Sequence, residues 1–112
     1  MTTTKDDGTG IDALTDIDRL IHEPARLMIM AYLYVVDSAD FLFLVRQTGL
    51  TLGNLSSHMS KLEAAGYIEV EKKFKGKKPH TMLRLTSEGH DAFRKYRQRM
   101  KQVIGETSEA AQ

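Results

Sequence analysis

Five lysines lie within seven residues of the chain, at Lys72, Lys73, Lys75, Lys77 and Lys78. An ammonium group binds phosphate oxygens, so such a cluster predicts contact with a polyanion, at a strength that depends on salt. The alternative interpretation is that these charges only keep the edge of a β-hairpin soluble. We favour phosphate contact, with Lys77 and Lys78 as the strongest candidates. Arg84 stays open, because it could face the same polyanion or pair with Glu69 or Glu71.

A second set of polar side chains falls on one face of the helix that the sequence predicts between Thr51 and Gly66. At about 100° per residue, Met59 and Leu62 fall beside Leu55 and form a buried stripe. The opposite face holds small or polar residues, namely Gly53, Ser57, Ser60 and Ala64, flanked by Asn54 and Lys61. Short side chains let a helix enter the major groove of DNA, where Asn pairs with adenine and Ser or Lys reaches bases or phosphates.

This helical face does not by itself decide between DNA reading and an ordinary solvated surface, because small polar residues are common on exposed helices. The residues that we expect to contact DNA from this helix are Thr51, Gly53, Asn54, Ser56, Ser57, His58, Ser60 and Lys61. From the lysine-rich segment we add Lys72, Lys73, Lys75, Lys77, Lys78 and Arg84.

The chain has four histidines that could suggest a metal site, His22, His58, His80 and His90. None stands at a familiar metal-binding spacing, and the chain has no cysteine to assist. His58 lies at the edge of the buried stripe, where a hydrogen-bonded structural role is expected. The sequence also lacks a Gly-rich phosphate loop, an HExxH motif and a nucleophile elbow. We therefore predict that the protein is not an enzyme and binds no metal or cofactor.

Composition and charge set the wider frame for these residues. The 112 residues are enough for one domain with one modest core. The net charge of +1 hides a basic body between residues 24 and 104 and acidic ends on both sides of it. A basic body suits a polyanionic partner. With no apolar run of about 20 residues and no signal-like start, we expect a soluble cytoplasmic protein without a membrane segment.

Helical periodicity predicts most of the elements that position these residues. Apolar residues at helical spacing predict a first helix over residues 11–21. A second, central helix begins at Pro24, which suits the first helical position, and ends at Asp37. A third runs from about Ala39 to Thr48 and is closed by Gly49. Thr51 can then cap the helix that carries the polar face.

After Gly66 the period changes to that of a β-hairpin. Residues 67–74 alternate as a strand does, residues 75–79 form a turn, and residues 81–86 return as the second strand. A last helix starts near Ser87. We expect residues 1–10 to be a disordered tail and residues 105–112 to fray. The domain at residues 11–104 is thus mainly α with a small β-hairpin, an α+β fold of the winged helix-turn-helix type.

The segment from Leu50 to Ile68 resembles the recognition-helix region of winged-helix transcriptional regulators related to MarR and ArsR. Its Gly-Asn-Leu, His, Leu-Glu and Gly pattern is similar to that of a compact winged-helix DNA-binding family. Further similarity lies in residues 21–27 and in residues 77–89, so the resemblance extends over about residues 17–104. The outer face differs in carrying Ser57 and no arginine, which predicts modest base readout.

The resemblance implies a DNA-binding dimer that pairs through its first and last helices. The candidate interface residues are Ile11, Leu14, Ile17, Leu20, Phe93, Tyr96, Met100, Val103 and Ile104. The expected partners are double-stranded DNA and a second copy of the chain, and the sequence leaves a small-molecule effector open. The alternative function is a protein-interaction module that docks on an acidic partner, because winged helices also bind proteins.

Overall fold

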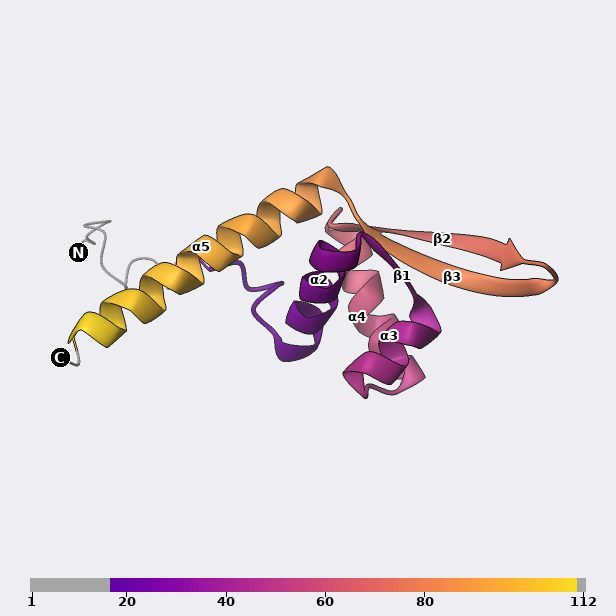
Figure 1. Ribbon diagram of the computed structural model, residues 1–112, viewed down its shortest axis with the longest axis horizontal. Coiled ribbons are helices and arrows are strands. Elements are labelled where there is room, and N and C mark those ends of the chain that lie inside the picture. Colours follow the sequence, from indigo (N-terminus) through magenta and orange to yellow (C-terminus); the bar gives the residue numbers. More distant parts are fainter. Residues whose placement is uncertain (1–16, 111–112) are drawn as a thin grey trace.

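The computed structural model describes residues 17–110, with side chains as far as residue 105. Its elements are α2 (Pro24–Val36), β1 (Ser38–Asp40), α3 (Phe41–Thr48), α4 (Leu52–Ala64), β2 (Ile68–Lys75), β3 (Lys78–Leu85) and α5 (Ser87–Ala110). Figure 1 shows α2, α3 and α4 as a helical body, from which the β2–β3 hairpin and α5 project in opposite directions along a 59 Å axis. The predicted fold class, mainly helical with a small hairpin, is confirmed.

The helix boundaries follow from capping groups in the sequence. The Glu23 side chain accepts a hydrogen bond from the backbone N–H of Arg26, directly before Pro24 at the start of α2. Asp40 caps α3 in the same way, by accepting from the N–H groups of Leu42 and Phe43. Gly49 ends α3 with a φ of 74°, a left-handed conformation that favours glycine.

A three-stranded antiparallel sheet of order β1-β3-β2 replaces the predicted two-stranded hairpin. Ala39 lies in the additional strand β1 and pairs with Leu83 of β3. For this reason α3 begins at Phe41 and not at Ala39 as predicted. The three-residue strand β1 is too short to show a period in the sequence. In the hairpin, Lys75 pairs with Lys78. The turn is therefore Gly76-Lys77, and Gly76 takes a φ of 64°, as a two-residue hairpin turn requires.

The core forms where α2 lies between α4, α5 and the sheet. Its large, fully buried side chains come from the segment before α2, from the three helices of the body and from the sheet: Ile21 of that segment, Ile29, Met30 and Leu33 of α2, Leu44 of α3, Leu55 and Leu62 of α4, and Ile68 and Leu83 of the sheet. The prediction that the helix after Pro24 is the central one is therefore confirmed. This packing fixes α4 on the body and leaves its opposite face outside.

The segment before α2 corrects one predicted helix. Residues 17–23 form turns and bends, whereas helical spacing predicted a helix through Ile21. The carboxylate of Asp18 accepts from the backbone N–H groups of Leu20 and Ile21, a local bond that competes with helix formation. Ile17 and Ile21 are nevertheless buried, so the apolar spacing identified core residues but not their backbone. Residues 1–16, with the predicted tail, lie outside the described residues.

The junction between α4, β2 and α5 is tightly bonded. The backbone N–H of Thr86 donates to the carbonyl of Tyr67, and the Thr86 hydroxyl donates to the carbonyl of Gly66. The same hydroxyl accepts from the N–H of Gly89 and so caps α5. A Cβ at Gly89 would lie 2.1 Å from the Tyr67 carbonyl oxygen, so only glycine fits against this backbone.

The last helix continues further than predicted. It runs to Ala110, whereas the sequence predicted fraying from residue 105. The stretch 105–110 contains one glycine and no proline, and a single glycine weakens a helix without ending it.

Candidate nucleic-acid interface

The two faces of α4 divide as the helical wheel predicted. Leu55 and Leu62 are fully buried against the core, and Met59 packs beside them. Of the eight predicted contact residues, the seven that are exposed are Thr51, Gly53, Asn54, Ser56, Ser57, Ser60 and Lys61. Apart from Leu52 at its start and Glu63 near its end, the exposed surface of α4 is therefore small and polar and carries one cation, Lys61.

The start of α4 combines a cap with an open stretch of backbone. The Thr51 hydroxyl accepts a hydrogen bond from the Asn54 N–H at 3.1 Å. Thr51 is therefore the N-cap of α4, and its hydroxyl oxygen is already used within the chain. A Cβ built at Gly53 would have no atom within 4 Å outside its own neighbourhood, and its φ is not positive. Neither packing nor backbone conformation therefore requires glycine at this position.

His58 is the exception among the predicted contact residues, because it is half-buried against the N-terminal end of α2. The Arg26 guanidinium donates to His58 Nδ1 at 3.1 Å and to the Leu20 carbonyl at 2.6 Å. Glu23 Oε1 lies 3.8 Å from the same nitrogen. The pKa of Glu23 is held below its ordinary value, chiefly by the hydrogen bond from the Arg26 N–H. His58 thus has the hydrogen-bonded structural setting that its place beside the stripe predicted.

The five lysines of the hairpin, which we call the wing lysines, are all exposed. Lys75 and Lys78 face each other across the turn that holds Lys77, so these three cations gather at the tip. Lys73 lies 3.8 Å from Glu71, an exposed pair that contributes little to stability. Four of the five have no acidic partner among the ion pairs of the described residues.

Arg84, which the sequence left open, forms an ion pair with Glu69 on the neighbouring strand. Both side chains are exposed, so the pair is weak and its guanidinium stays within reach of solvent. Of the two alternatives for Arg84, the structure shows the pairing with an acid.

A half-buried pair ties the wing to the start of α3. His80 Nδ1 donates to Asp40 Oδ1 at 2.8 Å, while the other oxygen of Asp40 caps α3. Burial alone would raise the pKa of Asp40, but the hydrogen bonds from His80 and from the α3 backbone outweigh it and lower that pKa. One carboxylate therefore joins the hairpin to the helix that precedes α4.

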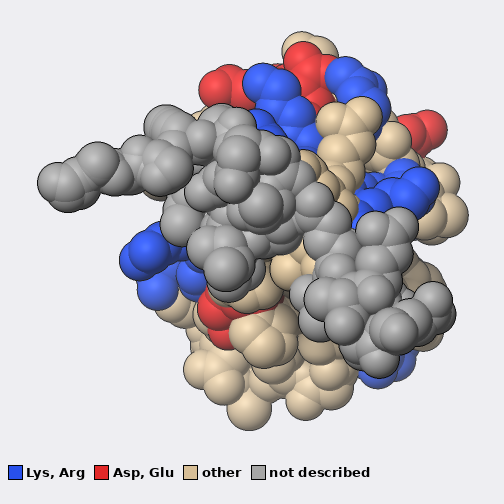
Figure 2. Space-filling view, turned by 90° about the vertical axis from the view of Figure 1, so that its left-hand side faces the viewer, with Lys and Arg blue, Asp and Glu red and all other residues tan. Residues whose placement is uncertain are grey.

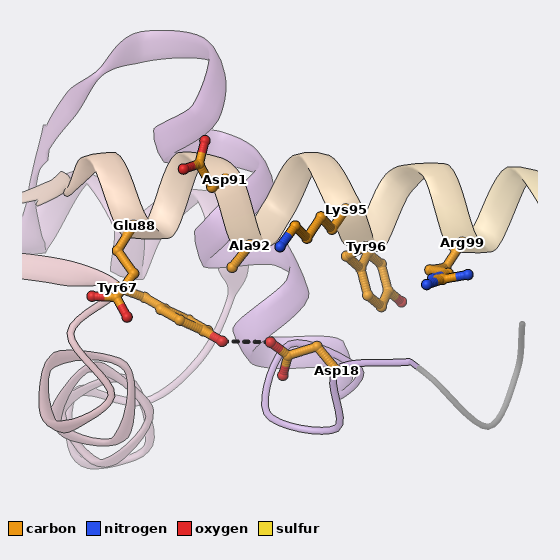
Figure 3. A pocket seen from close by; sticks show the side chains of 8 residues that line it. All are labelled: Asp18, Tyr67, Glu88, Asp91, Ala92, Lys95, Tyr96 and Arg99. Atoms are coloured by element: carbon orange, nitrogen blue, oxygen red, sulfur yellow. Dashed lines mark hydrogen bonds between the residues drawn. The ribbon is translucent and has the colours of Figure 1, made fainter.

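A hollow of about 540 Å³ lies where α5 passes the end of α4 (Figure 3). The Tyr67 hydroxyl donates to Asp18 at 2.6 Å across it, while Glu88 and Lys95 of α5 line its wall. Burial, with help from Asp18, raises the pKa of Tyr67 to about 12, so the phenol stays a donor. The contact joins the residue that directly precedes β2 to the segment before α2. Sequence reasoning did not find it, because the two residues are 49 positions apart.

The predicted dimer residues fall into three groups. Ile17, Phe93 and Tyr96 are buried in the core of the single chain, so their surfaces are already covered. Leu20, Met100 and Val103 are half-buried, and Ile104 is 60% exposed. Ile11 and Leu14 lie outside the described residues. The helical spacing on α5 therefore marked the domain core at its start, and an exposed apolar position only at its end.

Charged side chains of both signs lie on the surface at the α5 end of the molecule (Figure 2). Viewed from the end at which α5 terminates, Lys and Arg side chains lie at several places around the surface, with Asp and Glu in smaller groups (Figure 2). Two further features are absent from the described residues. Residues 17–110 contain no helix whose length and apolar character would let it cross a membrane. In the same residues, no three His, Asp or Glu side chains stand close enough to hold a metal ion.

Comparison with known proteins agrees with this geometry. The family model for the winged helix DNA-binding domain matches residues 25–104. An uncharacterized protein of Methanocaldococcus jannaschii is 32% identical over 78 residues, which are 70% of this chain and 85% of that protein.

Solved structures share the fold along most of the chain. A transcriptional regulator homologue from Pyrococcus horikoshii OT3 has a TM-score of 0.78 at 27% identity, covering 86% of this chain and 94% of that one. A MarR-family transcriptional regulator from Enterococcus faecalis V583 has a TM-score of 0.70 at 22% identity, covering 98% and 96%. The predicted resemblance to MarR-type regulators is confirmed for the fold, and the chain belongs to the winged helix DNA-binding domain family.

Proposed function

We propose that this protein is a sequence-specific regulator of transcription that binds double-stranded DNA as a homodimer. In this proposal α4 lies in the major groove and the wing lysines lie on the phosphate backbone. The observation that carries it is the division of α4 into a buried leucine stripe and an exposed face without acids near its start. Family membership supports the DNA-binding activity itself.

The exposed face of α4 suits the floor of a major groove. The helix has 13 residues, so it is ~20 Å long, and the groove that would receive it is about 12 Å wide. Gly53 and Ser57 let the backbone come close, while Asn54 offers a donor and an acceptor to an adenine edge. Lys61, about one turn beyond Ser57, would reach a phosphate or a guanine.

The wing supplies attraction that does not depend on sequence. Lys75, Lys77 and Lys78 lie together at its tip. Contacts between these ammonium groups and the phosphates of DNA would release counterions from the DNA. The wing would therefore set affinity, and α4 would set preference among sequences.

Dimerisation is supported by the shape of α5. This helix projects from the body on the side away from the wing, and Ile104 remains 60% exposed near its end (Figure 1). Pairing of two such helices would cover that position. Two copies of α4 would then stand about one DNA turn apart, ~34 Å.

Selection of bound duplexes from a random pool tests the proposal. We expect enriched sites with two related half-sites about one helical turn apart. The matched variants are Asn54→Ala/Ser57→Ala, which should lose preference for the enriched site, and Lys101→Ala, an exposed control on α5. Failure to retain any duplex at low salt would overturn DNA binding and favour docking on an acidic protein instead.

A further inference from the structure

The wing carries an apolar side chain that the fold does not use. Phe74 is 71% exposed, one residue before the tip lysine Lys75. The apolar residues nearer the base of the hairpin are covered, with Ile68 and Leu83 fully buried and Val70 packed against the core. Phe74 is thus an aromatic ring held out in solvent among cations.

The strand register shows which way Phe74 faces. It lies an even number of residues from Ile68, Val70 and Lys72, so it shares with them the face of the hairpin that packs on the helical body. Its cross-strand partner is Pro79, which places a second apolar group directly opposite. The face that begins as core therefore continues past the body as a Phe–Pro pair beside Lys72.

Phe74 also lies well beyond the helical body. It stands four residues beyond Val70, or ~13 Å further along the strand, close to the tip of the hairpin. The surrounding wing lysines attract the phosphates that line the grooves of DNA, so an apolar ring is brought to DNA by its neighbours.

We propose that Phe74, backed by Pro79, inserts into the minor groove of DNA that flanks the site read by α4. This inference rests on the proposed DNA binding and extends it by a contact of a different kind. Apolar side chains that enter the minor groove unstack a base step and bend the duplex, most easily at flexible pyrimidine–purine steps. The wing would then prefer flanks containing a TA step, without any hydrogen bond to a base.

The variant Phe74→Trp tests this directly, because the chain contains no tryptophan. The probe is a mixed-sequence 30-base-pair duplex with a TA step in its flank, at low salt. We expect the tryptophan emission of Phe74→Trp to fall at least about twofold when this duplex binds. Quenching of that emission by iodide should be suppressed in the complex. The control is Val35→Trp, at an apolar position on α2 that is 79% exposed, whose emission should not change.

Binding is measured separately, by fluorescence anisotropy of labelled DNA with the wild-type protein and with Phe74→Ala. We expect Phe74→Ala to bind the TA-flanked duplex about tenfold more weakly, with an unchanged dependence on salt because no phosphate contact is lost.

Two results would overturn the wedge. Intact binding with unchanged emission and iodide access of Phe74→Trp would remove the wedge and leave the proposed function standing. Shielding of Phe74→Trp that appears without DNA, as protein concentration rises, would assign the ring to protein docking. Failure of the wild-type protein to bind the duplex would instead overturn the proposed function itself.

Discussion

At the scale of single residues, the glycines of this chain separate structural from functional demands. Gly89 lies against the Tyr67 carbonyl and leaves no room for a Cβ. Gly53 has open space around it and ordinary helical backbone, so the fold gives no reason for its presence. An exposed glycine within a helix costs stability, which suggests that a partner must approach the backbone there.

The variant Gly53→Ala should therefore separate stability from binding. Removing a helical glycine is expected to raise the free energy of unfolding by ~0.5–1 kcal/mol, measured by urea denaturation. Affinity for a selected duplex should fall at least about tenfold, because a methyl group enters the closest contact. A variant that binds DNA as well as the wild type would place Gly53 outside the interface. Gly89→Ala is the contrasting change, expected to destabilise the fold by several kcal/mol.

A second residue-scale prediction concerns Asp40 and acid. Its folded pKa lies below the ordinary value of 3.8, so its charged form stabilises the native state. That contribution is fully present above pH 3.8 and is lost as the pH falls through the lower folded pKa. Asp40→Asn keeps an acceptor for the α3 cap and removes the titration. Its free energy of unfolding should fall less on acidification below pH 3.8 than that of the wild type, and equal falls would contradict the prediction.

At the scale of elements, the wing and α4 are expected to contribute different kinds of binding energy. The variant Lys77→Ala/Lys78→Ala should weaken binding to operator and random DNA alike. The slope of log K against log salt should flatten by about one unit for each lost phosphate contact. The control removes the same charge from α5, as Lys95→Ala/Lys101→Ala. Equal slopes for the wild type and the wing variant would show that the tip lysines only solubilise the hairpin.

The elements also show where sequence reasoning succeeded. The long helices and the hairpin were predictable, because Pro24, Gly49, Thr51 and the leucine spacing of α4 are local signals that the structure confirms. The exposed polar face of α4 followed from the same wheel. Strand β1 was not predictable, because its partner Leu83 is far away in the chain. Pairing choices such as Arg84 with Glu69 and Tyr67 with Asp18 depend on the tertiary fold in the same way.

At the scale of the whole molecule, the proposed dimer is the feature that a single chain cannot display. Wild-type protein at micromolar concentration should sediment at twice the 12.6 kDa chain mass. Ile104→Asp places a charge at the exposed apolar position of α5 and should shift the equilibrium toward monomer. Val35→Asp, at an even more exposed apolar position on α2, should leave the mass unchanged. A wild-type monomer would contradict the proposal.

The bonds at the junction of Tyr67, Thr86 and Gly89 have a mechanical consequence for such a dimer. They join the segment that follows α4 to the start of α5, so a rotation of one helix is expected to be passed to the other. With 24 residues, α5 is a lever ~36 Å long. A rotation of about 5° at its far end displaces the other end by ~3 Å, close to the ~3.4 Å rise of one base pair. Small changes where two α5 helices meet would therefore alter which spacing of half-sites the pair can span.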